Sequence, residues 1–88
     1  MVNNRRSEFD IIRDIIKISR NGAKKTEILY QGNMSYNQLQ NYLLFLVDKN
    51  ILEIKSEENG NGSSKVYYCT DKGNNLLNDI NRALAYFK

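Results

Sequence analysis

Residues 35–49 read SYNQLQNYLLFLVDK, and this stretch decides the fold. Ser35 is a favourable helix N-cap, and Gln38 three positions later completes a Ser-x-x-Gln capping box. The apolar positions recur at helical spacing along one side, and they are Tyr36, Leu39, Leu43, Leu46 and Val47. The other side is polar and carries Asn37, Gln38, Gln40, Asn41 and Asp48. The stretch therefore predicts a helix whose apolar side faces inward and whose amide-rich side faces outward.

Two apolar side chains interrupt the polar side of this helix. Leu44 and Phe45 both lie toward it, and large exposed apolar side chains at neighbouring positions usually have a covering partner. We expect that partner to be a later part of the chain, within residues 51–70 or 71–88, or a second subunit.

Two further helices are predicted before this stretch. In residues 7–20, Ser7 is a good N-cap, Asp10 takes the acidic place of the capping box, and apolar residues cover a wide face. Asn21-Gly22 favours a left-handed C-cap at the end of that helix. A short helix follows over residues 24–31. The Gly32-Asn33-Met34 turn then leads into residues 35–49, and two helices joined by so short a glycine turn match a helix-turn-helix.

The second half of the chain predicts a β ribbon and a final helix. Residues 51–56 and 65–70 alternate as half-buried strands do, and the polar run 57–64 between them is typical of a flexible hairpin tip. Together they form a predicted wing over residues 51–70. Thr70 suits the N-cap of a helix over residues 71–88, in which Gly73 indicates close approach to another backbone.

One stripe of that last helix suits a partner helix. Leu77, Ile80, Leu84 and Phe87 recur at 3-4-3 spacing, as in a short coiled coil. The stripe could instead close the core of its own chain. We expect a homodimer through this helix, with help from Phe9, Phe45 or Tyr86.

The order of elements predicts one fold. Three helices, a two-stranded ribbon and a C-terminal helix make an α+β, mainly helical, winged helix-turn-helix, and we expect a single domain over residues 1–88. In this architecture the third helix lies in the major groove of DNA and the ribbon lies along the backbone.

Composition narrows the function. The net charge is only +3, but residues 1–25 hold seven Lys or Arg against three acids. This cluster indicates either a positive field that attracts polyanions or simply a solvated helix face. The chain has no His, one Cys and no glycine-rich phosphate loop, so we expect no enzyme, no metal and no cofactor.

Cys69 is interpreted as a small buried apolar side chain. No apolar run approaches the length of a membrane span, so neither a span nor a signal peptide is expected.

The polar side of residues 35–49 provides the candidate DNA contacts. Asn and Gln can donate and accept at once, which matches the adenine edge. The base-reading candidates are Ser35, Tyr36, Asn37, Gln38, Gln40 and Asn41, with the first two turns favoured. The phosphate-pairing candidates are Arg5, Arg6, Lys24, Lys25 and Lys65. Alternatively, these amides only keep the helix soluble, since the chain contains thirteen Asn.

Two motifs resemble a known family. The run NGAKKT at residues 21–26 followed by SYNQLQNYL at residues 35–43, and the wing end YYCTDKG at residues 67–73, are similar to sequences of small archaeal winged-helix regulators. The resemblance implies a cytoplasmic, nucleoid-associated DNA-binding protein that dimerises through its last helix. This chain departs from the family in its short last helix and in the acidic Glu57 and Glu58 of its wing tip.

Three functions follow from these observations. The leading hypothesis is a transcription regulator that reads a specific double-stranded DNA sequence. The second is a nonspecific architectural DNA-binding protein, and the third is a protein-interaction winged helix that binds no nucleic acid.

Overall fold

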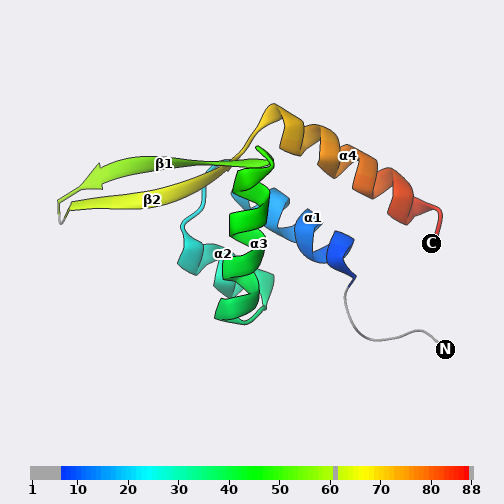
Figure 1. Cartoon of the computed structure of the whole chain (residues 1–88), viewed down its shortest axis with the longest axis horizontal. Helices are drawn as coiled ribbons and strands as arrows, with labels where there is room; N and C mark the ends of the chain where they lie inside the picture. The colour runs from blue at the N-terminus through cyan, green and yellow to red at the C-terminus, as the bar shows by residue number, and fades with distance from the viewer. Residues whose placement is uncertain (1–6, 61, 88) are drawn as a thin grey trace.

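The computed structural model describes residues 7–60 and 62–87, which form three helices, a two-stranded antiparallel sheet and a fourth helix (Figure 1). The elements are α1 (Glu8–Ser19), α2 (Lys25–Gly32), α3 (Tyr36–Asp48), β1 (Leu52–Asn59), β2 (Gly62–Cys69) and α4 (Asp71–Ala85). This arrangement confirms the predicted α+β fold class. The helix predicted over residues 71–88 ends earlier than expected, at Ala85.

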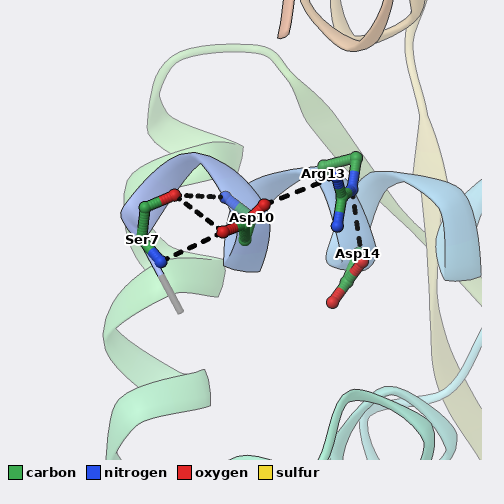
Figure 2. A network of polar contacts seen from close by, with 4 residues as sticks. All are labelled: Ser7, Asp10, Arg13 and Asp14. Carbon is green, nitrogen blue, oxygen red and sulfur yellow. Dashed lines mark hydrogen bonds and ion pairs between the residues drawn. The ribbon is translucent and has the colours of Figure 1, made fainter. Parts of the chain in front are cut away.

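The first helix begins with the predicted capping box (Figure 2). The Ser7 hydroxyl accepts a hydrogen bond from the Asp10 backbone N–H (3.1 Å), and the Ser7 N–H donates to the Asp10 carboxylate (3.2 Å). Asp10 also lies 3.4 Å from the Arg13 guanidinium, and Arg13 lies 3.5 Å from Asp14. The charge of Arg13 is therefore compensated locally, so α1 contributes less to a positive field than its basic residues suggest.

Ser35 caps the third helix as predicted, but Gln38 takes part through its backbone N–H and not through the predicted reciprocal side-chain bond, and one apolar position also differs. The Ser35 hydroxyl accepts a hydrogen bond from the Gln38 N–H at 3.1 Å. Leu39, Leu43 and Leu46 are buried. Tyr36, expected on the same apolar side, is 56% exposed. Helical side chains tilt toward the helix N-terminus, so a residue in the first turn extends past the end of the helix instead of into the core.

The core lies where the first three helices meet the base of the sheet and the start of α4. Two fully buried isoleucines of α1, Ile15 and Ile16, anchor it. Ile11 adds a third member from α1. The other buried members come from the remaining elements or their flanks, and they are Ala23, Ile28, Leu39, Leu43, Leu46, Ile51, Leu52, Tyr67 and Leu77. Burial of these aliphatic side chains supplies the main driving force for the fold.

The wing is a longer ribbon than the sequence predicted. The run 57–64, expected to be a flexible tip, continues the ladder, because Glu57 pairs with Ser64 and Asn59 pairs with Gly62. A β ladder is held by backbone hydrogen bonds, so a polar run can extend it when both faces of the ribbon meet solvent. The ribbon projects away from the helices (Figure 1) and accounts for a long axis of 50 Å.

A bridge that the sequence did not predict fixes the base of the wing. The N–H of Ala23 donates to the Tyr67 carbonyl (3.0 Å), and the N–H of Tyr67 donates back to Ala23 (2.8 Å). Gly22 just before it has φ +95°, and a Cβ there would lie 2.6 Å from the Tyr68 ring. The bridge therefore joins the residue before Lys24 directly to the wing.

The junction between α3, the wing and α4 is equally tight. The Thr70 hydroxyl caps α4 at the Gly73 N–H (3.0 Å) and also lies 2.6 Å from the Asn50 carbonyl oxygen. A Cβ on Gly73 would collide with the Ile51 carbonyl oxygen and approach the Cys69 sulfur to 2.8 Å. This confirms the predicted close approach at Gly73 and fixes the direction in which α4 leaves the wing.

Candidate nucleic-acid interface

The outer face of α3 presents the predicted amides unevenly. Asn37 and Asn41 are exposed, and their positions on the helix point away from the buried leucines. Gln38 is also exposed but lies on the α1 side, where it borders a hollow together with Glu8 and Asn41. Gln40 is only half-buried and faces the opposite side, toward the wing. Asn37 and Asn41 thus form an outer pair, whereas Gln38 and Gln40 lie on opposite flanks of α3.

The wing-side flank is a groove of about 460 Å³ rich in lysine. We call it the basic groove. Its walls are Lys24, Lys25 and Thr26 at the start of α2, Gln40 and Leu44 of α3, and Ile54, Ser64, Lys65 and Tyr67 of the wing. The charged residues in this lining are all lysines, so the groove carries a positive potential. Three predicted phosphate-pairing residues from two distant parts of the chain therefore meet beside α3.

A polar contact orders the floor of the basic groove. The Lys25 ammonium donates a hydrogen bond to the side-chain oxygen of Gln40 and lies 5.3 Å from the centre of the Tyr36 ring. Both contacts attract a cation, the first as a charge-assisted hydrogen bond and the second through the aromatic face. Lys25 and Gln40 are consequently held in defined positions before any ligand arrives.

Other predicted contacts are placed less favourably or not at all. Arg5 and Arg6 lie outside the described residues. Asp48 occupies the outer side of α3 near its end, and Glu58 lies near the wing tip, where both acids oppose a polyanion. Ser35 is exposed, but its hydroxyl already caps α3. These positions restrict the favourable surface to the first half of α3 and the base of the wing.

The face of the wing opposite Lys65 is internally paired. Tyr68 donates a hydrogen bond to the Glu57 carboxylate (2.8 Å), and that bond raises the pKa of the Tyr68 phenol. Lys55 lies 4.9 Å from the centre of the Tyr68 ring and 3.5 Å from Glu53. Lys55 is therefore engaged within the ribbon and adds little to the positive surface.

Sequence reasoning missed Leu44 and Ile54 as parts of this surface. Leu44 is 61% exposed and Ile54 is 42% exposed, and both line the basic groove. The signal for Leu44 was visible as an apolar residue on the polar side of the helix. The signal for Ile54 was absent, because an alternating strand does not reveal which of its faces meets a neighbouring helix.

The α1-side flank of α3 is a second groove with a different lining. We call it the apolar groove; it has a volume of about 430 Å³ and is lined by Phe9, Ile12, Phe45, Leu46, Ile51, Leu76 and Ile80, with Glu8, Lys49 and Lys72 at its borders. Phe9 and Phe45 are 59% and 51% exposed. This groove leaves two large aromatic side chains uncovered within the single chain.

The predicted dimer stripe of α4 is divided by the structure. Leu77 and Ile80 are already covered by their own chain, with exposed fractions of 5% and 3%. Leu84 is half-buried, and Phe87 at the end of the helix is 86% exposed. The surface left for a partner is therefore the distal end of α4 and not the whole stripe.

The Cys69 thiol, predicted as a buried apolar side chain, is less buried than expected and has polar neighbours. It is half-buried, donates to the Thr70 carbonyl oxygen (3.3 Å) and lies 3.6 Å from the Asn74 side-chain oxygen. Burial raises the pKa of this thiol. Within residues 7–60 and 62–87 no cluster of three metal-ligating side chains is found, and no helix there is long and apolar enough to cross a membrane.

Comparison with solved structures reveals relatives with the same architecture. Sso10a-2, a DNA-binding protein from the archaeon Sulfolobus solfataricus, is 28% identical, with 92% of this chain and 81% of that chain covered and a TM-score of 0.81. A PadR family transcriptional regulator from Eggerthella lenta is 17% identical, covers 88% of this chain and 73% of its own, and has a TM-score of 0.77. A PadR-like regulator from Bacillus cereus is 19% identical, with coverages of 88% and 82% and a TM-score of 0.75. The two PadR likenesses show the fold alone.

Sequence comparison leads to the same family. No curated protein sequence matches the chain. A sequence model of the winged helix-turn-helix family, however, matches residues 5–87, which is nearly the whole chain. The order of helices and strands, the capped α3 and the paired wing agree with that match. The resemblance noted from residues 21–26, 35–43 and 67–73 is confirmed, and the chain belongs to the winged helix-turn-helix family.

Proposed function

We propose that this protein binds double-stranded DNA and regulates transcription at sites whose sequence it reads. The observation that carries the proposal is that the basic groove opens directly beside the outer amides of α3. Phosphate-pairing and base-reading side chains thus share one surface, as a protein that lies along a groove of DNA requires.

The outer face of α3 supplies the base contacts in this proposal. Asn37 and Asn41 lie one helical turn apart and are exposed, so both reach the floor of a major groove that α3 enters. An Asn amide can pair bidentately with N6 and N7 of adenine. Gln38 and Ser35 border this face and contribute at its edge.

The lysines supply the phosphate contacts. Lys24 and Lys65 are exposed at opposite walls of the basic groove, and the Ala23–Tyr67 bridge fixes the separation of their backbones. A rigid pair of cations selects one register of the helix along the DNA backbone, although it reads no sequence itself. Arg5 and Arg6 precede the first described residue and are proposed as further phosphate contacts.

A relative with a known ligand supports the same function. Sso10a-2 is described as a DNA-binding protein, and it matches 92% of this chain at 28% identity. A protein with this function acts at chromosomal DNA, so we place it in the cytoplasm, associated with the nucleoid.

Selection of binding sites from a random duplex pool at physiological salt tests the proposal. A consensus sequence is expected, and Asn41→Ala should weaken binding to it by roughly 5- to 150-fold while binding to random DNA stays the same, since a bidentate base contact is worth about 1–3 kcal/mol. Asn78→Ala, an equivalent change at an exposed position of α4, is the control.

The same experiment separates the competing functions. Binding without a consensus, with affinity falling steeply as salt rises, would identify a nonspecific architectural protein. Absence of duplex binding even at low salt would leave a protein-interaction module and would end the proposal.

We also propose that the protein acts as a homodimer in which the end of α4 of one subunit covers the apolar groove of the other. The groove exposes Phe9 and Phe45, and the end of α4 exposes Tyr86 and Phe87, each more than 85% accessible. An uncovered aromatic pair and an uncovered apolar groove on one chain complement each other in a symmetric pair.

Sedimentation velocity over a range of concentrations tests the dimer. Phe87→Ser should shift the monomer–dimer equilibrium at least tenfold toward monomer. Tyr30→Ser removes an equally exposed aromatic side chain from α2 and should leave the equilibrium unchanged. A parent protein that remains monomeric at the highest concentration measured would contradict this part of the proposal.

A further inference from the structure

The hydrogen bond from Lys25 fixes the orientation of the Gln40 side-chain amide. The Lys25 ammonium has three donors and no acceptor, so the group of Gln40 that faces it must be the carbonyl oxygen. The amide nitrogen of Gln40 consequently points away from Lys25. A glutamine held in this way turns its NH₂ donors outward and keeps its oxygen at the lysine, whereas a free glutamine can turn either group toward a base.

An exposed apolar side chain lies next to this donor. Leu44 is one helical turn after Gln40, so the two side chains are neighbours on the same side of α3. Both line the basic groove, and Leu44 is 61% exposed. The groove therefore presents a donor beside an apolar surface, with Lys24, Lys25 and Lys65 around them.

We propose that Gln40 and Leu44 together read a thymine in the major groove. The inference rests on the DNA binding proposed above and specifies the base that this side of α3 selects. Thymine presents the O4 acceptor next to the C5-methyl group, which are the partners of a fixed donor and an apolar side chain.

The other three bases fit this pair less well. Cytosine places only the amino group N4 at this edge, and that donor would face the donors of Gln40. Adenine offers the acceptor N7, but beside the N6 amino donor and without a methyl group. Guanine offers the acceptors O6 and N7 but has no methyl group for Leu44 to cover. Discrimination thus combines the match to O4 and the methyl group of thymine with the opposed amino groups of cytosine and adenine and the missing methyl group of both purines.

Lys25 acts in this scheme as a positioning residue. One of its three donors holds the Gln40 oxygen, and the remaining two can still pair with a phosphate. Lys25 thereby links the position of the DNA backbone to the orientation of the Gln40 amide. Lys24 is the natural comparison, because it lines the same groove wall but Gln40 is held by Lys25.

Replacement of thymine by deoxyuracil tests the Leu44 contact. Each thymine of the selected duplex is changed in turn, which removes one methyl group and no hydrogen bond. The substitution should matter at one thymine in each half-site. There the affinity of the parent protein should fall about fourfold, as expected when one methyl-sized contact is lost. Leu44→Ala should bind both duplexes equally. Leu44→Met, which keeps an apolar side chain, and Phe45→Ala, which changes the opposite flank, should both retain the difference.

Exchange of the same T·A pair for A·T tests the donor. The parent protein should lose at least tenfold in affinity. Lys25→Met should reduce that discrimination to about threefold or less, because the Gln40 amide can then rotate and accept from adenine. Lys24→Met should weaken binding to both duplexes by the same factor, as the loss of a phosphate contact does.

The outcomes separate the inference from the function on which it rests. A consensus with no thymine whose methyl matters, or a deoxyuracil effect that persists in Leu44→Ala, would overturn the thymine contact while leaving DNA binding intact. Unchanged discrimination in Lys25→Met would overturn the positioning role. A protein for which no consensus can be selected would overturn both proposals.

Discussion

Leu44 and Phe45 are adjacent in the sequence but belong to opposite flanks of α3. Leu44 lies in the basic groove with lysines from α2 and the wing, whereas Phe45 lies in the apolar groove with Phe9 and residues of α4. Successive residues of a helix are rotated by about 100°, so neighbours at the centre of an exposed face diverge to its two sides. What looks in the sequence like a single apolar patch is therefore part of two surfaces.

We propose a different partner for each flank. The basic groove combines three lysines, the Gln40 amide held by Lys25, and the apolar side chains of Leu44 and Ile54. This combination fits the phosphates and base edges of DNA. The apolar groove has two exposed phenylalanines and a mainly apolar lining, with charges of both signs at its borders, which fits another protein chain. A change on one flank should consequently leave the function of the other intact.

The largest expected effect comes from removing the charge of the basic groove. Lys24→Gln, Lys25→Gln and Lys65→Gln combined should lower DNA affinity roughly a hundredfold at physiological salt and reduce the salt slope by about 2.7, since each phosphate contact contributes about 0.9. Fluorescence anisotropy titrations at several salt concentrations measure both quantities.

A charge-matched control belongs to the other flank. Lys17→Gln, Lys49→Gln and Lys72→Gln remove the same net charge from α1 and the border of the apolar groove. An equal fall in affinity and slope in this variant would show that net charge, and not the basic groove, governs binding.

The next effect concerns the junction that holds the wing and α4 in place. Gly73→Ala would push a methyl group against the Ile51 carbonyl oxygen and the Cys69 sulfur, so we expect a loss of about 1–3 kcal/mol in the free energy of unfolding. Gly60→Ala at the wing tip, where a Cβ would meet nothing within 4 Å, should change it little. Thermal and urea denaturation measure the difference, and equal stabilities would show that the junction can relax.

A crossed pair of substitutions tests the division of α3 directly. Leu44→Ser should lower affinity for a duplex with a single half-site about fivefold without changing the monomer–dimer equilibrium, since truncation of a central interface residue often costs more than 1 kcal/mol. Phe45→Ser should weaken dimerisation by a similar factor without changing affinity for that single half-site. DNA titrations and sedimentation of both variants supply the four values. If both variants impair the same property, the two flanks form one surface.

The smallest effect is a pH dependence at the outer face of the wing. The hydrogen bond to Glu57 raises the pKa of Tyr68, so the folded state holds this proton more tightly than the unfolded state does. The resulting stabilisation is complete below the normal pKa of tyrosine and is lost as pH rises through the higher folded value. Tyr68→Phe should therefore lose less stability than the parent protein between neutral and strongly alkaline pH. Parallel alkaline curves in chemical denaturation would contradict this assignment.

Local sequence signals predicted the helices well because their caps and periodicity act over a few residues. Ser7, Ser35 and Thr70 cap the expected helices, and the close approach at Gly73 is confirmed. The extended wing ladder and the Ala23–Tyr67 bridge escaped prediction, since backbone pairing leaves no mark in a polar sequence.

The site was predictable in its residue types but not in its geometry. The lysines at residues 24, 25 and 65 could be proposed as phosphate contacts, yet nothing local indicates that they meet around Leu44. The bond from Lys25 to Gln40 joins positions fifteen residues apart and depends on how α2 packs against α3. Burial of Leu77 and Ile80 likewise depends on the direction of α4, which the helical stripe alone does not fix.

NMR mapping of the complex tests the central claim most directly. A ¹⁵N-labelled sample titrated with the selected duplex reports backbone amides and the side-chain NH₂ groups of Asn and Gln together. The account predicts the largest shifts at Asn37, Gln40 and Asn41, at the residues around Lys25 and Lys65, and small shifts around Phe9 and Leu76. Shifts concentrated along the apolar groove, with the α3 amides unchanged, would contradict it.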